Sequence, residues 1–166
     1  MSRSTGIRTS AHYALPLAFS PFNWQLIARY PDHYARAAVN LKPDFAGTRP
    51  LFDESFVTEL ISSEMTAPQN IKWQELPAMH TVKLAEGLPG TAFYSWFARF
   101  PVLLKKSGDH LEFGDLAFGG GASGVRPAFQ LHIDLQQGSE APRAWLIWRN
   151  DRKSELTLTS APFNWL

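Results

Sequence analysis

The chain has 166 residues, 45% of them hydrophobic, and a formal net charge of +1. This size suits one domain with its own hydrophobic core, and so small a charge, spread along the chain, argues against electrostatic capture of nucleic acid. The absence of cysteine excludes disulfides, thiolate catalysis and cysteine-ligated zinc, although it does not choose a cellular compartment.

The N-terminal stretch is polar over residues 1–10 and then becomes apolar over 13–19, where Pro16 interrupts the run. This run is far shorter than the roughly 20 residues of a membrane helix, and it lacks the small-x-small cleavage pattern of a signal peptide. We therefore expect residues 1–17 to be a flexible segment, or the end of a longer helix, in front of a single domain at 18–166.

The tetrapeptide Pro-Phe-Asn-Trp occurs twice, at Pro21 to Trp24 and at Pro162 to Trp165. Because the flanks of the two copies share nothing, we interpret each as a proline-led turn whose aromatic side chains anchor a chain end on the core. A β-hairpin is predicted next, over 24–41, with apolar residues alternating along its first arm: Trp24, Leu26, Ala28 and Tyr30.

Two helices are expected in the middle of the chain. Asp53 is placed to cap a helix over 54–65, and Thr91 to cap a second helix over 92–100. The aromatic residues of the second helix recur at spacings of three and four, which predicts one buried face: Phe93, Trp96, Phe97 and Phe100. The proline-rich stretch between the helices is expected to be irregular, with one edge strand around Val82.

The last third of the chain predicts consecutive strands. A hairpin over 102–113 turns at residues 107–109 and is followed by a bulge at Gly114, a strictly alternating strand over 127–136, and two further strands. Short polar loops favour a meander over crossover connections. The predicted fold class is therefore α+β, with a curved, meander-like antiparallel sheet of about six or seven strands and two helices on one face.

His132 and Asp134 project from one strand at a spacing that could place an imidazole and a carboxylate on one metal ion. Two ligands do not make a site, and the other histidines, His110 among them, each stand alone in the sequence. A solvated strand face is therefore expected, with no metal and no cofactor. The glycine-rich stretch at 118–124 lacks the lysine of a phosphate-binding loop, and no serine is spaced from a histidine as a nucleophile, so no catalytic residue is predicted.

Arg99 lies at the end of the aromatic helix, where a guanidinium can stack on a ring or hold a carboxylate or phosphate. Two interpretations stay open: Arg99 covers the core rim and pairs with an acid such as Asp115, or it is the polar anchor of a ligand pocket. Glu112 and Asp115 could likewise be paired carboxylates or a charged edge. The candidate ligand-binding residues are Trp24, Trp96, Arg99, Phe100 and Asp115.

Three motifs follow one another at Pro21 to Trp24, Trp96 to Pro101 and Asp115 to Gly119. Their order resembles the soluble C-terminal region of the bacterial LexA-regulated, membrane-bound predicted metal-dependent hydrolases, and the likeness runs from about Ala18 to Leu135. The resemblance implies a multi-spanning inner-membrane parent protein whose histidine and acidic metal ligands lie in an N-terminal membrane portion. No ligand of that family can be carried onto a residue of this chain.

The resemblance therefore implies a soluble accessory domain of a membrane-bound hydrolase, not catalytic by itself. It would be associated with the bacterial inner membrane, on a side that the sequence does not determine, and its partner would be the membrane portion of its own parent protein. The alternative is a free-standing module that binds a small apolar molecule or lipid in an aromatic pocket. A self-contained hydrolase that uses His132 and Asp134 ranks last, and homodimerisation is left open.

Overall fold

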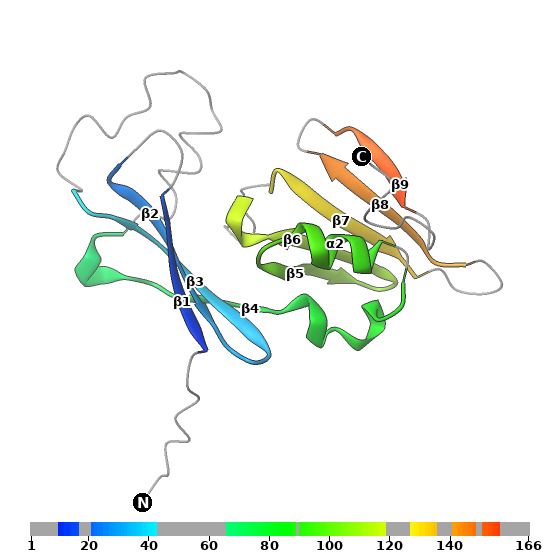
Figure 1. Ribbon diagram of the computed structural model, residues 1–166, viewed down its shortest axis with the longest axis horizontal. Coiled ribbons are helices and arrows are strands. Elements are labelled where there is room, and N and C mark those ends of the chain that lie inside the picture. The colour runs from blue at the N-terminus through cyan, green and yellow to red at the C-terminus, as the bar shows by residue number, and fades with distance from the viewer. Residues whose placement is uncertain are drawn as a thin grey trace, which may run out of the picture. The chain divides into compact units, whose positions relative to one another are not determined.

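The structure, a computed structural model, describes residues 10–16, 21–42, 66–88, 90–118, 127–135, 141–148 and 151–156. These residues form nine β-strands, one α-helix and four short 3-10 helices, so the fold is α+β, as the sequence predicts. The expected single sheet of six or seven strands with two helices is not matched, because the strands form two sheets of four and five. The chain divides into two compact units, residues 1–75 and 76–166 (Figure 1).

The sheet of the first unit has the strand order β1-β2-β3-β4. Its strands are β1 (Ala11–Pro16), β2 (Asn23–Arg29), β3 (His33–Asn40) and β4 (Gln74–Pro77), and the boundary between the two units falls inside β4. The predicted hairpin is confirmed, because β2 and β3 pair antiparallel along their full length. β1 pairs antiparallel with β2 and lies within residues 1–17, where the sequence pattern predicts no strand.

The buried face of β2 is not the one that the apolar alternation predicts. On the predicted face Trp24 and Leu26 are only partly buried and Ala28 is buried, whereas Asn23, Gln25 and Ile27 on the other face are all buried. Both polar atoms of the Asn23 side chain, and Nε2 of Gln25, have no hydrogen-bond partner in the part of the chain that the structure describes. Burial of an unpaired amide costs free energy. Tertiary packing must outweigh this cost, and it has therefore overridden the local pattern.

The sheet of the second unit has the order β5-β6-β7-β8-β9, and every neighbouring pair is antiparallel. This is the meander predicted for the last third of the chain. Its strands are β5 (Pro101–Ser107), β6 (His110–Asp115), β7 (Phe129–Asp134), β8 (Arg143–Trp148) and β9 (Lys153–Leu156). The bulge expected at Gly114 of β6 lies instead on the partner strand β5, between Leu103 and Lys105.

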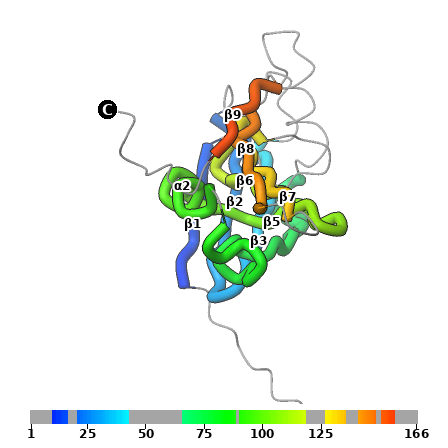
Figure 2. The backbone as a smooth tube through the Cα atoms, turned by 90° about the vertical axis from the view of Figure 1, so that its right-hand side faces the viewer, coloured from blue at the N-terminus to red at the C-terminus, as the bar shows by residue number. Residues whose placement is uncertain are grey.

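A single α-helix, α2 (Thr91–Phe97), is found among the described residues, and it is shorter than predicted. Its most buried side chain is that of Tyr94, whereas Trp96, expected on the buried face, is 59% exposed. Figures 1 and 2 show α2 along one face of the five-stranded sheet, and the core between them contains side chains from both. The sheet contributes Leu111, Phe113, Leu131, Ile133, Ala144, Leu146 and Leu156 to this core.

The proline-rich stretch before α2 is mostly irregular, as expected, but β4 is its strand and Val82 lies between two 3-10 helices. These two helices are η3 (Met79–Thr81) and η4 (Lys83–Ala85); the other 3-10 helices are η2 (Pro68–Asn70), before β4, and η5 (Leu116–Phe118), after β6. The helix predicted over 54–65, the second Pro-Phe-Asn-Trp copy and the glycine-rich stretch after Phe118 lie outside the described residues. Among the described helices, none has the length and apolar content required to cross a bilayer.

Candidate metal centre

The face of the five-stranded sheet that points away from α2 carries polar side chains along β6 and β7. Side chains alternate along a strand, so the fully buried Leu111 and Phe113 of β6 point to the core and their neighbours point to the opposite face. The same alternation on β7 turns Leu131 and Ile133 inward. The residues that share the outer face of these two strands are His110, Glu112, Gln130, His132 and Asp134.

The strand register brings these outer residues into two rows across the sheet. Residues opposite one another in an antiparallel pair lie on the same face with Cβ atoms roughly 5 Å apart. The first row contains, in strand order, Lys105, Glu112, His132, Trp145 and Glu155. The neighbouring row contains Ser107, His110, Asp134 and Arg143.

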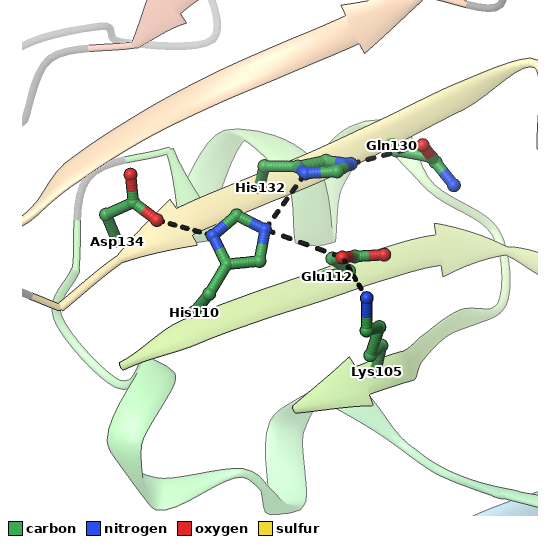
Figure 3. A network of polar contacts seen from close by, with 6 residues as sticks. All are labelled: Lys105, His110, Glu112, Gln130, His132 and Asp134. Atoms are coloured by element: carbon green, nitrogen blue, oxygen red, sulfur yellow. Dashed lines mark hydrogen bonds and ion pairs between the residues drawn. The ribbon is translucent and has the colours of Figure 1, made fainter. Parts of the chain in front are cut away.

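Three side chains from these rows converge on one point (Figure 3). Nε2 of His110 lies 3.1 Å from Nδ1 of His132 and 3.6 Å from Oε1 of Glu112. All three donor atoms lie within 4.8 Å of one another, and each side chain is partly buried. Two ligand atoms on a tetrahedral zinc ion are about 3.3 Å apart, given bonds of about 2.0–2.1 Å, so the spacing matches that around one small cation.

Each histidine ring is also held at its outer nitrogen by an oxygen atom. Nδ1 of His110 contacts the carboxylate of Asp134, and Nε2 of His132 lies 3.1 Å from Oε1 of Gln130 (Figure 3). In the tautomers that donate to these two oxygens, the outer ring nitrogens carry the hydrogens and the inner nitrogens of neutral rings carry lone pairs; in the other tautomer of His132 the contact between the rings is a hydrogen bond.

Two lone pairs and a carboxylate that face one another repel unless positive charge lies between them. That charge can be a second proton on one ring or a metal ion bound by all three groups. The outer oxygens also fit a metal site, since metal-bound histidines usually donate their other ring N–H to a carboxylate or carbonyl oxygen. The geometry therefore fits a candidate metal site as well as a network of hydrogen bonds and ion pairs around the two rings.

His110 lies beside a turn, as the sequence indicates, but the interpretation that it stands alone is wrong. His132 and Asp134 lie on the same face, but Asp134 contacts the ring of His110, while His110 and Glu112 are the two further candidate ligands beside His132. The available signal was a His-x-Glu at 110–112 and a His-x-Asp at 132–134. Both lie on strands with one wet face, so pairing these strands in the observed register brings the four side chains together.

Asp115, a candidate ligand-binding residue, is fully buried and holds the backbone where α2 leads into β5. Its carboxylate accepts hydrogen bonds from the backbone N–H groups of Arg99 at 2.8 Å, Phe100 at 2.9 Å and Ala117 at 2.9 Å. Asp115 therefore does hold Arg99, through the backbone. The guanidinium of Arg99 lies 5.3 Å from the centre of the Phe100 ring, as a stacked cation would.

The aromatic candidates differ in their surroundings. Phe100 is buried in the second unit, Trp96 is largely exposed there, and Trp24 belongs to the first unit, where its Nε1 donates to the carbonyl of Pro21 at 2.9 Å. A cavity of about 450 Å³ does occur in the second unit, between η3, η4 and the start of α2. None of the five candidate residues is among those that line it, which include Met79, His80, Glu86, Leu88 and Phe93.

Comparisons with protein-family models, with curated proteins and with solved structures find no match. The chemical interpretation of the chain therefore depends on its own side-chain geometry.

Proposed function

We propose that the second unit binds one divalent transition-metal ion, with Zn²⁺ as the best fit. The ligands are Nε2 of His110, Nδ1 of His132 and the carboxylate of Glu112. The observation that carries the proposal is the convergence of these three donor atoms on one point, with both rings fixed from outside by Asp134 and Gln130.

The ligand set selects the class of metal. Imidazole suits zinc, copper, iron and nickel, whereas calcium and magnesium prefer sites made of oxygen atoms. Two histidines and one carboxylate are a known zinc ligand set and also the set of non-haem iron sites. Three protein ligands leave a coordination position open, and in such a site a metal can polarise a bound group or lower the pKa of a bound water.

Isothermal titration with Zn²⁺ tests this proposal. We expect one zinc per chain for the wild type, and a loss of affinity of more than about 100-fold in His110→Ala and His132→Ala, because each variant removes a direct ligand. His12→Ala is the matched control, since His12 lies on β1 of the first unit. The proposal is wrong if zinc does not bind, or if the control loses as much affinity as the two ligand variants.

The role as an accessory domain of a membrane-bound predicted hydrolase is a second proposal. It is supported by the order of the proline and aromatic motifs, and it makes the membrane portion of a parent protein the partner. The coding sequence upstream tests it directly. Hydrophobic spans that contain histidine and acidic residues are the expected result, and an upstream stop codon or an unrelated soluble domain contradicts the proposal.

The cavity beside α2 favours a third proposal, a module that binds a small apolar molecule. Its volume of about 450 Å³ falls in the range of small-molecule pockets, and Met79, Leu88 and Phe93 give it an apolar part beside the polar His80 and Glu86. A fatty-acid titration followed by tryptophan fluorescence tests it, because Trp96 stands on the same helix as Phe93. A saturable change supports this role, and a flat response contradicts it.

A further inference from the structure

An exposed cation stands beside the three metal ligands. Lys105 of β5 pairs with Glu112 in the sheet register, and its Nζ lies 3.5 Å from Oε1 of Glu112 (Figure 3). The Lys105 side chain is 62% exposed, so its ammonium group can contact a ligand that arrives from solvent. The site thus combines a lysine with the coordination position that three protein ligands leave open.

The bulge in β5 is what places Lys105 there. Leu103 pairs with Phe113, so regular pairing would set Leu104 opposite Glu112, but the register shift sets Lys105 there instead. The displaced Leu104 packs over Gly114, where a Cβ atom would lie 2.6 Å from its Cδ1. The bulge and the glycine together bring a charged side chain to the metal ligands, as bulges near functional sites commonly do.

The charges around the site favour an anion once a metal is bound. A dication and Lys105 together outweigh the two carboxylates, Glu112 and Asp134, by one positive charge. An anion that binds the metal through one oxygen can accept a hydrogen bond from Nζ of Lys105 through another. Lysine acts as a compact point charge and is a common phosphate ligand, whereas planar bidentate recognition of carboxylates favours arginine.

We propose that the metal and Lys105 together bind a phosphate-type oxyanion, either the free ion or a phosphomonoester. One phosphate oxygen takes the open coordination position, and a second accepts a hydrogen bond from Lys105. This inference rests on the proposed metal site, and it assigns that site a class of ligand. Lys105 acts by binding the anion and does not ligate the metal.

Cobalt-loaded full-length protein provides the test, because the visible spectrum of Co²⁺ reports its coordination. We expect inorganic phosphate to change the spectrum saturably, and Lys105→Met to weaken phosphate about tenfold through loss of a charge-assisted hydrogen bond. The same variant should keep its metal affinity within about threefold, because the ligands remain. Lys106→Met is the matched control, since Lys106 is exposed and pairs with Leu111 of the core face.

The outcomes separate the two proposals. Failure to bind cobalt or zinc overturns both, whereas metal binding without a phosphate response overturns the oxyanion inference alone. Equal phosphate affinity in Lys105→Met and the wild type also overturns it. Methyl phosphate distinguishes the two sources of the ligand: affinity similar to that of inorganic phosphate supports an ester, and binding of inorganic phosphate alone supports the free ion.

Discussion

The Asp115 carboxylate shows how a buried charge can serve the backbone. It accepts hydrogen bonds from the backbone N–H groups of Arg99, Phe100 and Ala117. It therefore joins the segment between α2 and β5 to η5, which follows β6. Sequence alone suggested a ligand contact or a pair with the Arg99 side chain, because nothing local shows that backbone amides from positions 99 and 117 meet. The contact depends on β5 and β6 pairing in register, which is a long-range event.

Replacing Asp115 with asparagine should therefore destabilise the fold. One carboxylate oxygen becomes an NH₂ group that faces a backbone N–H donor, and we expect a loss of about 2–3 kcal/mol in the free energy of unfolding. Urea unfolding followed by tryptophan fluorescence measures this loss. Asp109→Asn, at the exposed turn between β5 and β6, is the control and should change stability by less than about 0.5 kcal/mol. Equal losses in the two variants would show that the three amide contacts contribute nothing.

Tyr94 makes the free energy of unfolding depend on pH in the alkaline range. Burial raises its pKa well above the ordinary value of 10.0, and the negative charge of Asp115 raises it further. The phenol stays protonated in the folded state and donates to the carbonyl of Phe129 at 3.1 Å. In the unfolded chain the phenol loses its proton near its ordinary pKa, so above that pH the free energy of the unfolded state falls relative to that of the folded state.

We expect stability to fall by about 1.4 kcal/mol for each pH unit above 10 through Tyr94 alone. Tyr94→Phe should remove this component, while it costs about 1 kcal/mol at neutral pH through the lost hydrogen bond. Urea unfolding of both proteins between about pH 8 and pH 11 gives the two slopes. The other tyrosines titrate in both proteins and add the same component to both slopes. Parallel slopes for wild type and variant would therefore contradict the assignment of the pH dependence to Tyr94.

At the scale of elements, α2 shows what local sequence can and cannot supply. The aromatic spacing predicts a helix here, and Pro101 correctly marks the start of the next strand. The predicted cap is wrong, because Thr91 donates its hydroxyl to the carbonyl of Leu88 and Gly90 occupies the capping position with φ of 75°. The need for glycine there comes from Leu131 and Leu156, which belong to distant strands.

A matched pair of glycine substitutions separates the backbone cost of a positive φ at this cap from the cost of overpacking the core. A Cβ at Gly90 would lie 2.6 Å from Cδ1 of Leu156 and 3.2 Å from Cδ1 of Leu131, whereas one at Gly87 would meet nothing within 4 Å. Both glycines have positive φ, so Gly87→Ala carries the backbone cost alone, about 1 kcal/mol. We expect Gly90→Ala to cost about 2–4 kcal/mol, because overpacking of the core is added. Thermal unfolding of the two variants tests this difference, and equal melting temperatures would contradict it.

At the scale of the whole molecule, the alternation of apolar residues predicted most strands but not the number of sheets. The strands β5 to β9 pair in the order in which they follow one another in the sequence, so sequence order alone gives the topology of this meander, although only the β5–β6 and β8–β9 loops are short. The four-stranded sheet needs β1 and the short β4, and neither carries a strong pattern, since β4 has four residues and ends in Pro77. The candidate metal ligands were missed for a related reason, because the register that brings them together is a property of the paired strands.

The proposed metal site predicts where zinc should stabilise the chain. Its ligands lie on β6 and β7, so bound zinc adds crosslinks between these two strands, and a ligand at 100 times its dissociation constant stabilises the folded state by about 2.7 kcal/mol. Hydrogen exchange with and without Zn²⁺ should show slower exchange of the amides in His110–Asp115 and Phe129–Asp134.

The strands of the first unit provide the internal control for that experiment. Exchange in β2 and β3 should not change, because the three ligands all lie in the second unit. His132→Ala should abolish the protection of β6 and β7, since it removes one ligand and leaves two. Protection that appears in β2 and β3 as well, or that persists in His132→Ala, would place the zinc elsewhere. The convergence of His110, Glu112 and His132 would then be a network of hydrogen bonds and ion pairs without a metal ion.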